Sequence, residues 1–240
     1  MTTYVLVPGA DGRAWFWHRL VPEVQARGHR AVAVELPQDD SAGLAEYADA
    51  VVRAVDEPRD GLVLVAQSLA GFTVPLVCER LAVDALVLVN AMVPVFGESA
   101  GQWWENTGQG AARSAKAVRD GRGPDPAFDV LVDFFHDVPP EVTERALAEE
   151  VGGPSPTLFA EPWPLRTWPE VPTRFLQGRE DRFFPIEFQR RVVQERLGIT
   201  VEETPGGHLS ALSHPAELAE LICRPPTAAA DREDRGHPAS

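Results

Sequence analysis

The stretch from Leu62 to Gly71 (LVLVAQSLAG) restricts the possible folds more than any other part of the chain. It opens with an apolar run rich in valine and free of turn residues, which predicts a fully buried strand. Ser68 follows, between the small residues Ala66 and Ala70. Such small neighbours allow a sharp turn from strand to helix, as in the G-x-S-x-G nucleophile elbow. The alternative interpretation is a serine that only caps the next helix. The residues that follow the other predicted strands must distinguish a nucleophile from a helix cap.

Apolar runs alternate with helical patterns along most of the chain. We expect strands over 3–8, 31–36, 62–67, 85–90, 173–177 and 199–204, and helices over 13–27, 43–56, 69–81, 185–197 and 214–222. Short links between alternating strands and helices indicate an α/β fold, with a mainly parallel sheet of about six strands and helices on both faces.

The alternation stops between residues 91 and 171, where helical patterns near 110–120 and 140–150 replace it. Because strands of the same sheet flank this region, we interpret 91–171 as an inserted helical cap between two core parts, 1–90 and 172–223. Residues 224–240 are rich in proline, alanine and charge, which is typical of a disordered tail.

Composition excludes several functions. A net charge of −14 opposes binding to a nucleic-acid backbone. No apolar run approaches the roughly 18 residues that a membrane span needs. The N-terminus has no signal-peptide pattern, and the two cysteines, Cys78 and Cys223, have no metal or redox spacing. We therefore expect a cytoplasmic protein with free thiols.

Three residues suited to nucleophilic catalysis follow three predicted strands. Ser68 follows the third strand, Asp181 the fifth and His208 the sixth. Ligands of open parallel sheets bind at the carboxyl ends of the strands, and the order Ser, Asp, His is the one found in α/β-hydrolases. We predict that His208 accepts the proton of Ser68 and that Asp181 orients the imidazole.

Rival residues lie near the two partners of Ser68. Glu180 adjoins Asp181, and His214 follows His208 but precedes a proline, where it is expected to cap the last helix. The two histidines lack a third ligand at a recognisable spacing, so no metal is expected. The loop from Gly9 to Gly12 lacks the full G-x-G-x-x-G pattern, so no dinucleotide cofactor is expected either.

From about Thr3 to Ile222 the chain resembles the α/β-hydrolase superfamily, and within it the cap-bearing group of plant methylesterases and hydroxynitrile lyases. The resemblance is carried by Pro8-Gly9-Ala10, Trp15-Phe16-Trp17, Ser68, the stretch from Gly178 to Pro185, and Gly207-His208-Leu209. It implies an oxyanion hole made of the backbone N–H groups of Ala10 and Leu69. Pro8 and Gln67 stand where the group usually has histidines.

The resemblance also bears on the reaction. The hydroxynitrile lyases have a lysine after the catalytic histidine and a threonine in the first loop, where this chain has Leu209 and Gly9. Both differences favour ester hydrolysis. Besides Gly9 and Leu209, possible pocket residues are His136 and the cap aromatics Trp103, Trp104, Phe128, Phe134, Phe135 and Phe159.

Three hypotheses for function follow. The first is a serine hydrolase that cleaves a small or medium apolar carboxylic ester through an acyl-enzyme. The second is an acyl transferase, thioesterase or lactone-forming cyclase that uses the same three residues on an ester or thioester. The third is a ligand-binding receptor without turnover. The related plant enzymes suggest a monomer or a homodimer.

Overall fold

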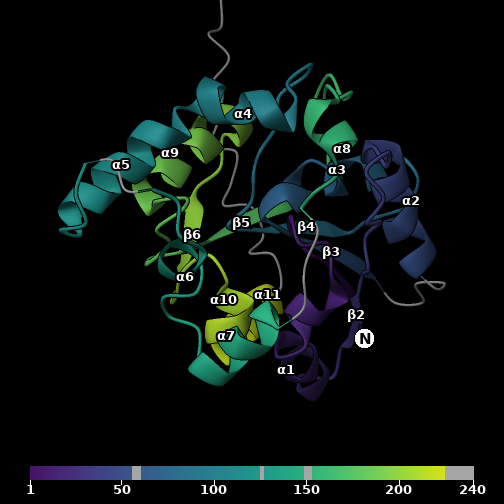
Figure 1. Ribbon diagram of the computed structural model, residues 1–240. Coiled ribbons are helices and arrows are strands. Elements are labelled where there is room, and N and C mark those ends of the chain that lie inside the picture. Colours follow the sequence, from purple (N-terminus) through teal and green to yellow (C-terminus); the bar gives the residue numbers. More distant parts are fainter. Residues whose placement is uncertain (56–60, 125–126, 149–152, 225–240) are drawn as a thin grey trace, which may run out of the picture.

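The computed structural model describes residues 1–55, 61–124, 127–148 and 153–224, and its centre is a parallel sheet (Figure 1). The six strands are β1 (Thr3–Val7), β2 (Arg30–Ala33), β3 (Leu62–Gln67), β4 (Ala85–Val89), β5 (Thr173–Gly178) and β6 (Val201–Thr204). Their order is β2-β1-β3-β4-β5-β6, and every pair is parallel. The predicted fold class is confirmed.

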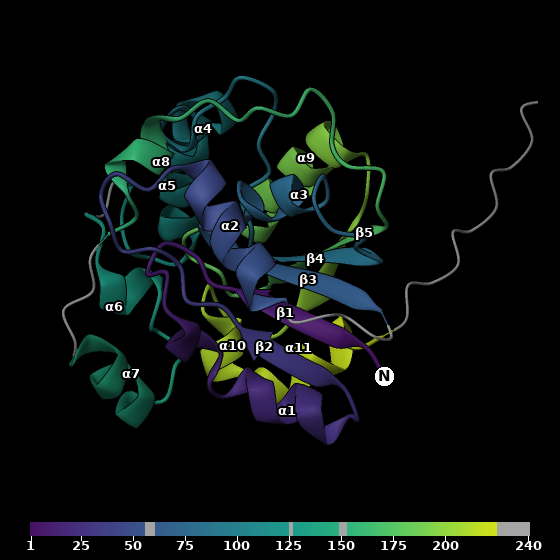
Figure 2. The same ribbon diagram turned by 90° about the vertical axis from the view of Figure 1, so that its right-hand side faces the viewer.

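Helices cover both faces of the sheet (Figure 2). One face carries α2 (Leu44–Ala54), α3 (Val74–Val77) and α9 (Ile186–Leu197), and the other carries α1 (Leu20–Ala26), α10 (Ser210–Ser213) and α11 (Pro215–Ile222). Successive side chains of a strand point to opposite faces. In β3, Leu62 and Leu64 accordingly belong to the apolar cluster of the first face, and Val63 and Val65 to that of the second. The continuous apolar run of β3 therefore supplies two cores.

Two predicted helices are interrupted because each contains a proline. The expected helix over 13–27 consists of a 3-10 turn, η1 (Ala14–Trp17), and α1. The expected helix over 69–81 consists of a 3-10 turn, η2 (Ser68–Gly71), and α3. Proline has no N–H and crowds the preceding turn, so Pro22 and Pro75 are tolerated only near the start of a helix.

The remaining helices lie between β4 and β5 in the chain. They are α4 (Ala100–Thr107), α5 (Gln109–Arg119), α6 (Val130–Asp133), α7 (Pro140–Leu147) and α8 (Pro156–Ala160). Figure 2 shows α6 and α7 on the side of the sheet opposite the N-terminus, which is the side where the parallel strands end. We keep the name cap for residues 91–171, and its boundaries stay a prediction.

The predicted strand over 31–36 is wrong beyond Ala33, because the N–H of Leu36 bonds to the carbonyl of Gly12 in a loop instead of extending the sheet. The predicted tail, apart from Arg224, lies outside the described residues. Within the described ranges, no helix is both long enough and apolar enough to cross a membrane.

Candidate active site

Ser68 stands at a sharp turn directly after β3. Its φ is +52°, a left-handed conformation that is uncommon for a residue with a side chain. Gly71 completes the turn, because a Cβ there would come within 1.8 Å of the carbonyl oxygen of Met92. The N–H of Met92 in turn donates to the carbonyl of Ser68 at 2.9 Å. This close packing holds the serine in a conformation that local preferences disfavour.

His208 connects Ser68 to Asp181. Its Nε2 lies 3.1 Å from Ser68 Oγ, and its Nδ1 lies 2.9 Å from Asp181 Oδ2. A carboxylate oxygen only accepts hydrogen bonds, so Nδ1 carries the proton and Nε2 has a free lone pair. In this tautomer the imidazole can accept the hydroxyl proton of Ser68.

Asp181 is fully buried and held by both of its oxygens. Oδ1 accepts the backbone N–H groups of Phe183 and Phe184, both at 2.8 Å. Oδ2 accepts the side-chain amide of Gln177 at 3.1 Å as well as the imidazole. The rival residue Glu180 instead has a half-exposed side chain and accepts the N–H of Gly206 at 2.7 Å. Asp181 is thus the acid in contact with the imidazole.

Asn90 joins the loops that carry Asp181 and His208. It is fully buried directly after β4, and its Oδ1 accepts the N–H of Gly178 at 2.7 Å. Its Nδ2 donates to the carbonyls of Gly207 and His208 at 3.1 and 3.0 Å. Like Ser68 it has a left-handed φ, +47°. Asparagine tolerates this conformation better than most residues, which is the one sequence signal that could have marked it.

Three phenyl rings enclose the imidazole of His208. Phe134 of the cap stacks on it with 4.8 Å between ring centroids and 16° between planes. Phe184 and Phe183 meet it edge-on at 5.0 and 5.3 Å. Apolar surroundings strengthen the electrostatic interactions among the buried polar groups.

A cavity of about 460 Å³ opens beside Ser68 and His208. Its walls come from the first loop, the strand ends and the cap. The lining residues are Ala10, Asp11, Arg13, Trp15, Phe16, Gln67, Ser68, Phe128, Val130, Phe134, Phe135, Ala146, Leu147, Gly153, Pro154, His208, Leu209 and Leu212. A largely apolar wall with a few polar groups is typical of a small-molecule site.

The cavity contains two charged residues that no sequence pattern singled out. Asp11 and Arg13 both line it, and Asp11 Oδ1 accepts the backbone N–H of Arg13 at 3.3 Å. Burial raises the pKa of the Asp11 carboxyl, and Arg13 opposes this shift. The one sequence signal that could have marked Asp11 and Arg13 as cavity residues is their position in the loop after β1, because β1 is the neighbour of β3 and ends beside Ser68.

Among the expected pocket residues, Phe128, Phe134, Phe135 and Leu209 line the cavity, and so does Ala10, which is predicted to belong to the oxyanion hole. The others lie elsewhere. Gly9 lies behind the serine, because a Cβ on it would come within 2.9 Å of Ser68 Cβ. Leu69, the other residue predicted for the oxyanion hole, is the second residue of η2. Backbone N–H groups at the start of a helix have no partner within the helix.

The prediction that Trp103, Trp104 and Phe159 line the pocket is wrong for the cavity beside Ser68. Trp103 is fully buried, and its indole donates to the carbonyl of Val93 at 3.1 Å. Trp104 packs edge-on against Phe183, with 5.5 Å between ring centroids. These residues belong to the apolar core instead, because α4 packs against α8 and the ring of Trp103 meets that of Phe188 in α9 edge-on, with 5.7 Å between centroids.

The two other candidate histidines lie behind the loop that carries His208. His136 does not line the cavity, and its ring presses against Gly207, where a Cβ would meet its Cε1 at 2.6 Å. Burial lowers the pKa of His136, which favours the neutral imidazole. His214 precedes α11, as expected, but its side chain does not cap the helix and contacts Ser213 Oγ at 3.0 Å.

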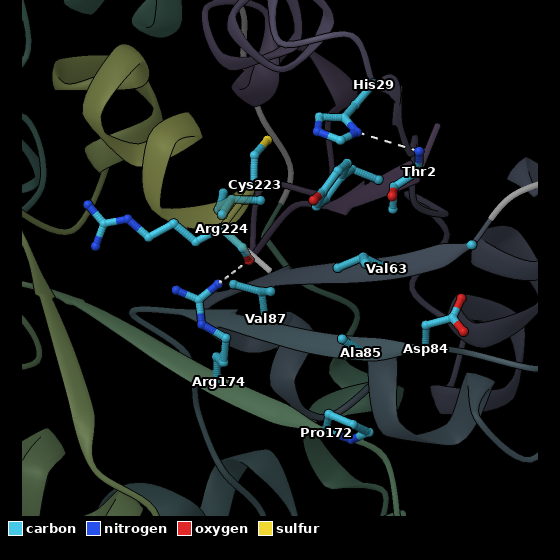
Figure 3. A pocket seen from close by; sticks show the side chains of 13 residues that line it. Thr2, His29, Val63, Asp84, Ala85, Val87, Pro172, Arg174, Cys223 and Arg224 are labelled. Carbon is cyan, nitrogen blue, oxygen red and sulfur yellow. Dashed lines mark hydrogen bonds between the residues drawn. The ribbon is translucent and has the colours of Figure 1, made fainter. Parts of the chain in front are cut away.

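A second cavity, of about 370 Å³, lies at the opposite edge of the sheet, where the strands begin (Figure 3). Its walls include Tyr4, His29, Asp84, Arg174 and Cys223. Burial raises the pKa of the Cys223 thiol and raises that of Tyr4 to about 12. Both groups are therefore protonated at neutral pH, and Cys223 is a poor nucleophile.

Within the described parts of the chain, no group of three or more His, Cys, Asp or Glu side chains is arranged to hold a metal ion. Ser68 and His208 line the first cavity, and His208 connects Ser68 to the buried carboxylate of Asp181. A parallel sheet that brings these three side chains together beyond its strand ends has the architecture of an α/β hydrolase.

Comparison with known proteins agrees with this architecture. A model of the Alpha/beta hydrolase family matches residues 4–221, and the chain belongs to this family. It is 28% identical to "Probable esterase PIR7A" of Oryza sativa subsp. indica over 254 residues, which cover 92% of this chain and 95% of that protein. It is 23% identical to "Polyneuridine aldehyde esterase" of Rauvolfia serpentina over 248 residues, covering 91% of this chain and 93% of that protein.

Solved structures share the fold. The crystal structure of polyneuridine aldehyde esterase superposes with a TM-score of 0.74 at 21% identity, covering 92% of this chain and 98% of that one. That of the methylesterase MES16 from Arabidopsis superposes with a TM-score of 0.71 at 16% identity, covering 92% and 97%.

Proposed function

We propose that this protein is a serine carboxylesterase that hydrolyses a small or medium apolar ester through an acyl-enzyme on Ser68. One observation carries the proposal: Ser68 Oγ, His208 and Asp181 form a continuous hydrogen-bonded chain, with distances of 3.1 and 2.9 Å. A serine hydroxyl is a weak nucleophile at neutral pH, and it needs an oriented base of this kind.

In the first half-reaction, His208 Nε2 accepts the hydroxyl proton while Ser68 Oγ attacks the ester carbonyl. The new C–O bond forms and the carbonyl electrons move to oxygen. The backbone N–H groups of Ala10 and Leu69 stabilise this oxyanion. The tetrahedral intermediate then collapses, and the alcohol leaves with the proton that His208 had taken.

In the second half-reaction, water gives a proton to His208 and attacks the acyl-enzyme. The acid leaves, and the proton returns to Ser68 Oγ. Asp181 stabilises the imidazolium in both halves because its Oδ2 accepts the Nδ1 proton.

The lining of the cavity supports an apolar substrate. Outside Ser68 and His208 its walls are mainly aromatic and aliphatic, and its volume of about 460 Å³ suits a small molecule. The names of two relatives, "Probable esterase PIR7A" and "Polyneuridine aldehyde esterase", support the same reaction class. The cytoplasmic location that we propose agrees with the free thiols of Cys78 and Cys223.

The test is intact-mass analysis after exposure to a fluorophosphonate, which labels activated serines. We expect one adduct on the wild-type protein and none on Ser68→Ala or His208→Ala, with both variants folded by circular dichroism. Adduct formation on Ser68→Ala would show that another residue is the nucleophile. A folded wild-type protein without an adduct would favour a ligand-binding receptor.

A further inference from the structure

The cap contacts the loop that carries His208 through a short segment between α6 and α7. Asp137 Oδ2 accepts the backbone N–H of Gly207 at 2.7 Å, across 70 residues of sequence. Gly207 immediately precedes His208. This hydrogen bond therefore holds the peptide group between Gly206 and Gly207, one residue before His208.

The contact is close because glycines form the opposite side. A Cβ on Gly207 would come within 2.6 Å of His136 Cε1 and 3.0 Å of Asp137 Oδ1. Gly206 has a φ of +89°, and a Cβ there would come within 2.9 Å of Asp137 Oδ2. Only residues without a side chain let the cap approach the backbone to this distance.

The carboxylate of Asp137 is directed at that N–H. The side chain is 15% exposed, and its nearest basic groups are His136 Nε2 at 3.9 Å and His214 Nδ1 at 3.8 Å. Both distances exceed that of a hydrogen bond. The bond to the N–H of Gly207, at 2.7 Å, is therefore the side-chain hydrogen bond that holds Asp137 within the described residues.

The same segment also holds the imidazole itself. Phe134, three residues before Asp137, stacks face to face on the ring of His208 at 4.8 Å. Asn90 holds the carbonyls of Gly207 and His208 from the sheet side. The core thus holds the carbonyls on both sides of His208, those of Gly207 and of His208 itself, and the cap holds the N–H of Gly207.

We propose that Asp137 is a positioning residue: by holding the N–H of Gly207, it keeps His208 Nε2 at hydrogen-bond distance from Ser68 Oγ and makes the placement of the base depend on the cap. This inference rests on the role of His208 in the proposed function. Small displacements of a catalytic group are costly, since an error of about 1 Å can slow a reaction about a hundredfold.

The substitution Asp137→Ala removes the acceptor and leaves the contacts of Asn90 in place. We expect the loop to stay folded and the imidazole of His208 to be displaced from Ser68. The rate constant of acylation by p-nitrophenyl acetate should then fall about tenfold or more, while KM changes less than twofold. Asp137→Asn keeps an acceptor oxygen and is expected to restore most of the rate. A role in stability alone would lower the melting temperature without this split between acylation rate and KM.

The matched control is Asp129→Ala. Asp129 is also in the cap and also accepts backbone N–H groups, those of Leu131 at 2.9 Å and Val132 at 3.3 Å. None of the hydrogen bonds described for Asp129 reaches the loop of His208. We expect its acylation rate within twofold of wild type. An equal loss in Asp129→Ala and Asp137→Ala would overturn the proposal, because cap stability alone would then explain both.

His208→Ala, measured alongside, separates the two proposals. If His208→Ala is inactive and Asp137→Ala acylates at the wild-type rate, the positioning role is wrong and the proposed function stands. If His208→Ala acylates at the wild-type rate, the proposed function is wrong. Should Asp137→Ala fail to fold, Asp137→Ser replaces it, since its shorter side chain cannot place an oxygen at the same point; a wild-type rate in that variant would refute the positioning role.

Discussion

Replacing Asn90 by alanine tests whether one buried side chain holds the site together. The substitution removes the acceptor of the Gly178 N–H and the donor to the carbonyls of Gly207 and His208. A buried polar group without a partner costs about 1–3 kcal/mol, and each lost hydrogen bond to a carbonyl costs about 0.5–1.5 kcal/mol. The free energy of unfolding should therefore fall by about 2–6 kcal/mol.

Such a loss is a large fraction of the roughly 5–15 kcal/mol that stabilises a typical domain. It can be measured by urea unfolding followed through the fluorescence of the protein's six tryptophans. We expect a lower midpoint with an unchanged slope, because the surface exposed on unfolding stays the same.

The left-handed backbone of Asn90 offers a second explanation that a control can separate. At its φ of +47°, alanine is strained by about 1–2 kcal/mol, whereas glycine is not. If backbone strain were the whole effect, Asn90→Gly would be as stable as wild type. The hydrogen bonds predict instead that Asn90→Gly loses at least about 2 kcal/mol. A loss below about 1 kcal/mol in both variants would refute the assignment.

Two further predictions concern the acid and a thiol. Asp181→Asn places an amide where Oδ2 accepts the His208 Nδ1 proton, which favours the imidazole tautomer that cannot accept the Ser68 proton. We expect kcat to fall about 10⁴-fold with KM little changed. A kcat within tenfold of wild type in steady-state kinetics would contradict this role. Burial raises the pKa of the Cys78 thiol to about 11, so roughly 0.1% is thiolate at pH 8. Alkylation of Cys78 by iodoacetamide, followed by mass spectrometry, should be slow in the folded protein at pH 8 and faster as the pH rises toward 11. In urea it should be fast at pH 8, and equal rates in the folded and unfolded protein would contradict burial of the thiol.

The sequence determined the class of fold because its elements depend on local patterns. The apolar run of β3 and the small residues around Ser68 predict a strand followed by a tight turn, whatever the rest of the chain does. Residues that follow parallel strands must meet at one edge of the sheet, so the order Ser68, Asp181, His208 was enough to predict which side chains come together. The structure brings these three within hydrogen-bond distance.

Where the prediction failed, distant contacts decided the outcome. The indole of Trp103 could equally have faced the cavity, but packing against Phe184 and Phe188 buries it in the core. A tryptophan pair in a helical insertion shows only that apolar surface must be covered. It does not show which neighbour covers it.

The hydrogen bonds that hold the loop of His208 in place could not be predicted from the sequence either. Asn90 and the carbonyl of His208 are 118 residues apart, and Asp137 and the N–H of Gly207 are 70 apart. Neither bond has a local pattern, because each depends on how two loops and the cap pack against one another. The sequence alone therefore determined which side chains meet at the strand ends, whereas only the tertiary structure decided what holds them in place. Hydrogen bonds between distant backbone and side-chain groups exist only after the chain has folded.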